Sequence, residues 1–315
     1  MNKRHLIWTL AGLVLQTACS ATSPPPAVSQ RSTPQMAAAS GIDWKVVEAT
    51  LERSGSMQPG GVYKFSMPRA DLAVTSNGVR IAPALALGSW LAFQPKGEDA
   101  AVAMGDLVLT EGEYQRVIAR LQEGGVRQTA IHKHLLDESP AIWWTHVEAE
   151  GDPVRIAETV HAGLALTGTT ADGPSPGAPV PFSLDTAAIS GILGYSGNIS
   201  GGVYHVSVPR AETIRARGVV VPPAMGTATA LNFQPTGNGR AAINGDFVML
   251  ADEVNPVIAA LKQNGIEVVS VHNHMLTEEP RLFFMHFWAN ADALDLARGL
   301  RAALDHTNVA AAATR

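Results

Sequence analysis

Three histidines and a glutamate recur at the same spacing in two segments of the chain. Residues 132–146 read HKHLLDESPAIWWTH and residues 272–286 read HNHMLTEEPRLFFMH, so both follow the frame His-x-His-x3-Glu-x-Pro-x5-His. A duplicated fold explains why the apolar positions recur, but it gives no reason for this polar set to recur with them. Imidazole nitrogens bind transition metals, and histidines two residues apart on a strand point the same way. The frame therefore predicts a transition-metal site in each copy.

Each predicted site has three histidine ligands and one nearby carboxylate. Glu138 in the first copy and Glu278 in the second would act as a fourth ligand, or as the catalytic base for a metal-bound water. The expected cofactor is zinc or another transition metal (Cu, Ni or Fe). Three protein ligands with an open position are typical of catalytic zinc, but the spacing leaves both a metal-binding protein and a metal-dependent hydrolase open. The predicted metal ligands are His132, His134, His146, His272, His274 and His286.

The same residues also fit three other interpretations. In a metal-free site, Glu138 would orient His134, which would act as a general base. Alternatively, the histidines form a structural network of hydrogen bonds. The two copies also differ inside the frame, where Lys133 is replaced by Asn273, so that one site could be active and the other vestigial.

A β-hairpin would bring the histidines together within each copy. The turn falls around Ser139, where Asp, Ser and Pro favour chain reversal. A hairpin symmetric about this residue places His132 opposite His146 and His134 opposite Trp144. Since side chains alternate between the two faces of a strand, all four then share one face, and the second copy repeats the arrangement.

The elements around the hairpin recur as well, which indicates two homologous tandem domains of the α+β class. From the third strand onward the order is βαββα, which predicts a mainly antiparallel sheet with helices packed on one face. Asp106 and Asp246 begin the third strands, each after a glycine, where a role in the turn is expected. In the first copy, strands are predicted at 62–67, 90–94 and 106–110, the hairpin at 126–136 and 141–148, and helices at 43–53, 113–122 and 153–166.

Composition along the chain indicates where the domains begin and end. Residues 20–40 are rich in Ser, Pro, Thr and Ala, which is typical of a flexible tether, and the Pro/Gly-rich residues 169–183 are predicted to be a linker. The predicted domains are a first repeat at 41–168 and a second repeat at 184–306, followed by a tail at 307–315.

Residues 1–19 are typical of a signal peptide. Lys3 and Arg4 precede an apolar stretch that is too short to span a bilayer. Cys19, the only cysteine, follows the tetrapeptide LQTA, which is similar to a bacterial lipobox whose cysteine is acylated. We therefore expect an exported lipoprotein, anchored to a membrane through Cys19 and facing the periplasm or the cell exterior. Without acylation, it would be a soluble periplasmic protein.

Overall composition excludes other classes. The net charge of −5, with no basic stripe, gives no electrostatic basis for binding nucleic acid. A hydrophobic content of 46% with 16% charged residues indicates a globular protein with buried cores instead of a disordered chain.

Two further sets of residues are candidates for ligand binding. Arg69 and Arg210 each follow a strand-ending proline and would either clamp an anionic ligand or pair with a nearby acidic side chain. Trp144 and Phe284 would stack on sugar rings. The aromatic residues support an alternative function, a non-enzymatic cell-envelope binding module that recognises glycan or peptidoglycan.

Several motifs together resemble the LppY/LpqO family of bacterial exported proteins and lipoproteins. They are GGVYKFSMPR at 60–69 with GGVYHVSVPR at 201–210, the Phe-Gln-Pro element at 93–95 and 233–235, and the histidine frame. The resemblance covers both copies and implies export, lipidation and a tandem pair of domains. It implies no activity and transfers no catalytic residue.

Overall fold

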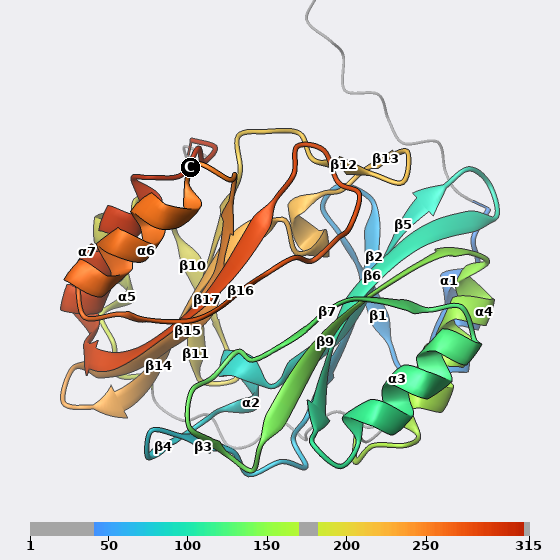
Figure 1. Cartoon of the computed structure of the whole chain (residues 1–315), viewed down its shortest axis with the longest axis horizontal. Helices are drawn as coiled ribbons and strands as arrows, with labels where there is room; N and C mark the ends of the chain where they lie inside the picture. The colour runs from blue at the N-terminus through green and yellow to red at the C-terminus, as the bar shows by residue number, and fades with distance from the viewer. Residues whose placement is uncertain (1–40, 170–181, 312–315) are drawn as a thin grey trace, which may run out of the picture. The chain divides into compact units, whose positions relative to one another are not determined.

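The computed structural model of the chain describes residues 41–169 and 182–311, which form two similar halves. The predicted signal peptide, Cys19 and the tether lie outside the described residues, as does most of the predicted linker. Each half contains one six-stranded antiparallel sheet, and its helices lie against that sheet (Figure 1). The predicted α+β class and the two homologous halves are confirmed.

The first sheet ends in the hairpin strand that carries His132, the first histidine of the frame. Its strands, in spatial order, are β1 (Gly55–Gln58), β2 (Val62–Pro68), β5 (Gly88–Lys96), β6 (Ala100–Thr110), β9 (Ile142–Gly151) and β7 (Arg127–His132). Its helices are α1 (Trp44–Leu51), α3 (Tyr114–Glu123) and α4 (Pro153–Leu164). The order β6-α3-β7-β9-α4 is the predicted βαββα unit, interrupted only by the two-residue strand β8 (Glu138–Ser139).

The second half repeats this order. Its sheet runs β10 (Gly197–Ser200), β11 (Val203–Pro209), β14 (Ala228–Gly237), β15 (Arg240–Met249), β17 (Phe283–Asp292) and β16 (Glu267–His272). Its helices are α5 (Thr186–Leu193), α6 (Val254–Gln263) and α7 (Ala293–Leu304). Small elements complete both halves: β3 (Thr75–Ser76), β4 (Val79–Arg80), α2 (Pro83–Ala86), β12 (Arg215–Ala216), β13 (Val219–Val220) and the 3₁₀ helix η1 (Pro223–Met225).

Helix α3 sets the position of β7. Its apolar side packs on the sheet, where Val117 and Leu121 are fully buried. Gly125 follows with φ +82, a left-handed conformation that glycine adopts without strain. The chain therefore turns back sharply into β7 at the sheet edge. In the part of the chain that the structure describes, no helix has the length and apolar character needed to cross a membrane.

Each sheet is buried on both faces. One face packs against the helices of the same repeat, around residues such as Phe65 and Phe93. The other face packs against the opposite repeat: Met104 of β6 shares a cluster with Met275 and Leu282. A second cluster joins Trp144 to second-repeat residues in the same way. Because a fully buried side chain of this size contributes about 1.5–3 kcal/mol, the contact between repeats is part of the core.

Two details of the predicted strands need correction. Strand β6 begins at Ala100, so Asp106 lies in the middle of a strand and the expected turn role is wrong. In the hairpin, His132 pairs with Trp144 while Ala130 pairs with His146, two residues away from the symmetric register. A shift of two residues keeps every side chain on the same face. The predicted shared face of His132, Trp144 and His146 is therefore unaffected.

Candidate metal centre

The six histidines of the two frames lie in one cluster to which both repeats contribute. Ring centroids are 3.7 Å apart for His132 and His272, 3.6 Å for His134 and His286, and 3.8 Å for His146 and His274. Each of these pairs joins one repeat to the other. The prediction of two separate sites is corrected, because the histidine-bearing faces meet each other across the contact between repeats.

Edge strands β7 and β16 bring the two frames together. Thr129 Oγ1 of β7 donates a hydrogen bond to the backbone oxygen of His274, at 2.7 Å. In the other direction, Ser270 Oγ of β16 donates to the backbone oxygen of Lys133, at 2.8 Å. These bonds hold the two His-x-His segments side by side.

Two aspartates that were expected in turns, Asp106 and Asp246, belong to the cluster. Asp106 pairs in register with His146 on the neighbouring strand, and Asp246 pairs with His286 in the same way. Asp106 Oδ2 lies 3.5 Å from His134 Nε2, and Asp246 Oδ2 lies 2.9 Å from His274 Nε2. We call the six histidines with these two residues the histidine–aspartate cluster. The signal for them was available in the sequence, since the dipeptide Gly-Asp recurs at matching positions.

The preceding glycines are needed where neighbouring strands approach closely. A Cβ on Gly105 would lie 2.6 Å from the backbone oxygen of Trp90, and one on Gly245 would lie 1.9 Å from that of Ala230. The oxygen of Gly245 also bonds His286 Nδ1 at 2.7 Å. This contact leaves the Nε2 atom of His286 to face the cluster.

Much of the hydrogen-bonding capacity of the cluster is unused. Five histidines and both aspartates are at most 9% exposed. An unpartnered buried polar atom costs about 1–3 kcal/mol, and such atoms are rare in native proteins. Here the unpartnered atoms include His132 Nδ1, His146 Nε2, His272 Nε2, His286 Nε2, Asp106 Oδ1 and Asp246 Oδ1. They are metal-ligand types, so a bound cation would satisfy several of them at once.

Burial, together with repulsion between neighbouring histidines, keeps five of the imidazoles neutral. The pKa values of His132, His134 and His146 are lowered by desolvation and by the neighbouring histidines. Desolvation also lowers the pKa values of His272 and His286. A neutral imidazole has a free lone pair and can bind a metal, whereas a protonated one cannot.

Desolvation, and then the charge of Asp246, raises the pKa of the Asp106 carboxyl well above its usual value. Both effects arise because the two carboxyl groups lie close together and are largely buried. A divalent cation beside Asp106 would remove this repulsion and favour the ionised form. The raised pKa of Asp106 and the neutral histidines thus point to the same kind of ligand.

Among the described residues, four groups of three side chains have ligand atoms within 4.8 Å of one another. Two groups mix the repeats. They are His132, His134 and His286, and His132, His146 and His272. The other two groups each come from one repeat and share no residue. They are Asp106, His134 and His146, and Asp246, His272 and His274.

Glu138 and Glu278, the predicted carboxylates of the site, belong to none of these groups. Glu138 Oε1 accepts hydrogen bonds from Lys133 Nζ, at 2.5 Å, and from the backbone N–H of Ile142, at 3.2 Å. Glu278 Oε1 accepts from the backbone N–H of Leu282, at 2.9 Å. Glu138 thus links the two ends of its own hairpin connection, whereas Glu278 bonds Arg281 and Leu282, which both follow it. The carboxylates beside the histidines are those of the two aspartates instead.

Trp144 and Phe284 support the histidines and present no face to a sugar. The Trp144 ring, 1% exposed, stacks on His134 with centroids 4.5 Å apart, and its Nε1 donates to the backbone oxygen of Ala86. Phe284, 0% exposed, stacks on His274 at 3.8 Å. The two rings fix the orientation of equivalent imidazoles in the two repeats.

Arg69 and Arg210 are occupied by acidic side chains of their own repeats. Arg69, which is fully buried, bonds Asp71 through Nε and Nη2 and Glu113 through both Nη atoms, at 2.8–3.0 Å. It also donates to the backbone oxygen of Val108 at 2.8 Å. Arg210 repeats this pattern in the second half. Both arginines therefore pair with nearby acidic side chains, which is one of the two roles expected from the sequence. The donors that make these bonds are not free to clamp a ligand.

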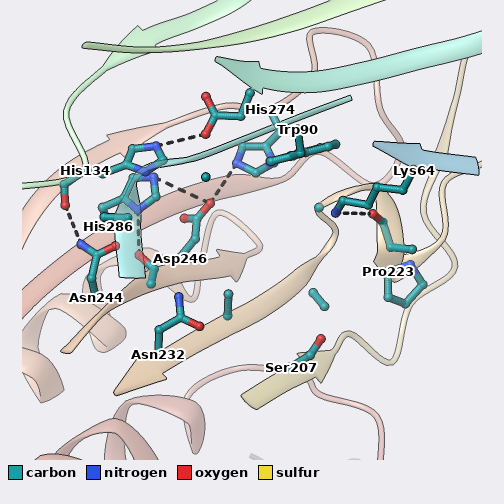
Figure 2. Close-up of a pocket in the computed structure, with 18 of the residues that line it drawn as sticks. Lys64, Trp90, His134, Ser207, Pro223, Asn232, Asn244, Asp246, His274 and His286 are labelled. Carbon is teal, nitrogen blue, oxygen red and sulfur yellow. Dashed lines mark hydrogen bonds and ion pairs between the residues drawn. The ribbon is translucent and has the colours of Figure 1, made fainter. Parts of the chain in front are cut away.

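A pocket of about 620 Å³ opens onto the histidine–aspartate cluster. Cluster residues of both repeats line it, including both aspartates, His134 and His274. Figure 2 shows Asp246 beneath His134, His286 and His274, with Trp90 and Lys64 along one side and Asn232 and Ser207 opposite. The sequence gives no signal for Lys64 or Trp90, because neither has an equivalent of the same type in the second copy.

Fold and cluster together define a tandem-repeat α+β protein whose repeats share one polar centre. The family model described as Domain of Unknown Function (DUF1259) matches residues 45–166 and 187–306, and the chain belongs to this family. The match confirms the tandem pair of an uncharacterised domain. The name LppY/LpqO remains a resemblance.

Solved structures give only weak similarity. A double-ringed trimeric shell protein of the RMM microcompartment is 12% identical over 66% of this chain and 83% of its own, with a TM-score of 0.20. The trimeric microcompartment shell protein PduB is 11% identical over 81% and 91%, with a TM-score of 0.20. EtuB from Clostridium kluyveri is 10% identical over the same shares, with a TM-score of 0.19. Similarity at this level supports no conclusion about the fold or the function of this chain. No curated protein matches the sequence.

Proposed function

We propose that the two repeats together hold a transition-metal centre and that the protein is a metal-dependent hydrolase. The observation that carries the proposal is one buried cluster of six imidazoles and two carboxyl groups, in which many ligand atoms have no hydrogen-bond partner. Imidazole with carboxylate suits zinc and iron, and imidazole also suits copper and nickel. The two repeats meet in this centre, since its closest ring contacts cross between them.

The ligand groups favour two ion positions. The groups built on Asp106 and on Asp246 share no side chain, so both can be filled at the same time. Each offers two imidazoles and one carboxylate. With three protein ligands, each ion keeps positions for water or substrate. His132 and His286 lie outside these two groups and remain to accept a proton or to complete a coordination shell.

Access to the cluster favours catalysis over a closed structural ion. The pocket reaches both aspartates, and structural zinc sites are by contrast closed by four protein ligands. A bound transition metal lowers the pKa of its water to about 7 and so supplies a nucleophile near neutral pH. A metal-binding protein without turnover is the second candidate, because eight potential ligands in one place would also hold ions firmly.

Elemental analysis of the mature chain, purified without a metal-chelating tag, tests the centre itself. We expect one to two equivalents of one transition metal in the wild type, and loss of metal in the double variant Asp106→Asn, Asp246→Asn. His161→Ala and His205→Ala remove histidines outside the cluster and should retain the wild-type content. Equal metal content in all four proteins, or no metal uptake on titration with Zn, Cu, Ni or Fe(II), would refute the proposal.

Cobalt substitution separates the hydrolase from the metal-binding protein. An open position on Co(II) would make its visible spectrum change when azide is added, and such a protein should hydrolyse members of a panel of nitrophenyl esters and phosphoesters. A spectrum that ignores azide, together with no turnover by the native metal form, would leave the metal-binding protein as the function.

We also propose that the protein acts outside the cytoplasm as a lipoprotein. The support is in the sequence: the basic start, the short apolar stretch and Cys19 after LQTA. Three acyl chains would anchor it firmly, since each buried methylene contributes about 0.8 kcal/mol. Cys19→Ser should move the protein from the membrane fraction to the soluble fraction. Mass spectrometry of a wild-type N-terminus without acyl groups would contradict the proposal.

A further inference from the structure

Lys64 of β2 is a half-buried cation in the wall of the pocket that opens onto the histidine–aspartate cluster. Its Nζ donates one hydrogen bond, to the backbone oxygen of Ala224 at 3.0 Å, and lies 4.3 Å above the centroid of the Trp90 ring. Among the described residues, no acidic side chain pairs with it. Burial alone lowers its pKa to about 8, with no opposing effect from a neighbouring carboxylate.

The surroundings of Lys64 leave its ammonium group able to bind an anion. An ammonium group has three N–H donors, and the backbone oxygen of Ala224 takes one of them. The face of Trp90 favours a cation near it, which keeps the side chain in the wall of the pocket instead of in solvent. Figure 2 shows Lys64 and Trp90 on the same side of the pocket, and in this view the Trp90 ring lies between Lys64 and His274.

The second repeat does not reproduce this arrangement. His205 stands at the position of Lys64, and Ala230 stands at that of Trp90. His205 bonds Asn232 Oδ1 at 2.8 Å and does not line the pocket. The potential metal ligands that line the pocket therefore come in equivalent pairs from the two repeats. Lys64, by contrast, has no lysine or arginine equivalent in the second repeat. One end of a bound molecule would be recognised differently from the other.

We infer that the pocket binds a small anionic substrate, whose phosphate or carboxylate oxyanion lies on Lys64 while its other end reaches the metal ions. This inference rests on the proposed metal centre. A cation on one side and Lewis-acid ions at the inner end fix the direction of a bound molecule. A volume of about 620 Å³ is typical of sites that bind small molecules.

The test is calorimetric titration of the metal-loaded mature chain with inorganic phosphate and, separately, with acetate. Lys64→Gln should weaken binding roughly tenfold or more, the loss expected for a hydrogen bond to a charged group. Lys64→Arg should restore most of it, because the positive charge and the donors return. Lys96→Gln is the matched control, since it removes a lysine that pairs with Glu150 outside the pocket.

Each result of the titration has one meaning. Tighter Lys64-dependent binding of phosphate assigns a phosphoryl substrate, and tighter Lys64-dependent binding of acetate assigns a carboxylate substrate. Equal binding by the wild type and Lys64→Gln, or no binding of either anion, overturns the inference. Metal content is measured on the same samples. An absence of metal refutes the proposed centre, whereas full metal content with Lys64-independent binding refutes only the role of Lys64.

Discussion

His132 and His272 occupy the same position in the two repeats, and their ring centroids lie 3.7 Å apart. No other pair of equivalent histidines is in such contact, because His134 meets His286 and His146 meets His274. The cluster therefore lies around the approximate two-fold axis that relates the repeats. The full set of eight side chains is therefore assembled only when both repeats are folded and joined.

The contact between repeats predicts a single cooperative unfolding transition. Met104, 3% exposed, packs in a cluster shared with the second repeat, so Met104→Ala should destabilise the whole chain by about 2–5 kcal/mol. Met57, 57% exposed, is the control, and Met57→Ala should change the free energy of unfolding by less than about 0.5 kcal/mol. Denaturant unfolding followed by fluorescence and by circular dichroism measures both. Two separate transitions, of which Met104→Ala shifts only the one that belongs to the first repeat, would show that the repeats fold independently.

The neutral histidines predict lower stability at acidic pH in protein freed of metal by a chelator. Their pKa values are lowered in the folded state, so below pH 6.5 the unfolded chain binds protons that the folded chain excludes. The free energy of unfolding is thus highest above pH 6.5, and it decreases progressively as the pH falls below that value. Each such histidine contributes a slope of up to about 1.4 kcal/mol per pH unit. Asp106, whose pKa is raised, gives the opposite slope, but five histidines outweigh it.

Denaturant unfolding at pH 7.5 and at pH 5.5 measures this slope. The double variant His132→Gln, His272→Gln removes two of the titrating groups and should show a shallower slope than the wild type. A free energy of unfolding that is the same at both pH values would mean that the imidazoles become protonated inside the fold.

The sequence predicted which face of the hairpin carries the histidines, but it did not predict which surface packs against that face. Alternation along β9 places Trp144 and His146 on one face whichever register the hairpin takes, so this part of the site followed from the pattern. Periodicity does not say which surface packs against that face, and two copies of the same face pack against each other here. Asp106 was missed because β6 is buried on both faces and its Ala100–Met104 stretch shows no alternation.

A difference between two equivalent glutamines predicts unequal roles in joining the repeats. Gln234 of the second repeat bonds the first at two backbone atoms: Oε1 accepts from Ala82 N at 2.8 Å and Nε2 donates to Arg80 O at 2.7 Å. Gln94 is its equivalent, but Pro222 stands where the first repeat has Ala82 and lacks an N–H. Gln94 Oε1 is buried without a partner.

Gln234→Ala should therefore cost about 1–3 kcal/mol, whereas Gln94→Ala should cost less. Denaturant unfolding of the two single variants gives the comparison directly. Equal losses would mean that the side chains act by packing alone, and a larger loss for Gln94→Ala would contradict the assigned bonds.

The buried arginines are predicted to stabilise the fold without binding a ligand. Arg69→Met removes a guanidinium that is bonded to Asp71, Glu113 and the backbone, and leaves Glu113 without its partner inside the protein. Loss of one member of a buried ion pair costs about 3–5 kcal/mol. Lys96→Met breaks a half-exposed pair with Glu150 and should cost no more than about 1 kcal/mol. Thermal unfolding ranks the two variants. Phosphate or acetate affinity, measured where Arg69→Met is still folded, should match the wild type, and a selective loss of anion affinity would return Arg69 to the ligand clamp that the sequence first suggested.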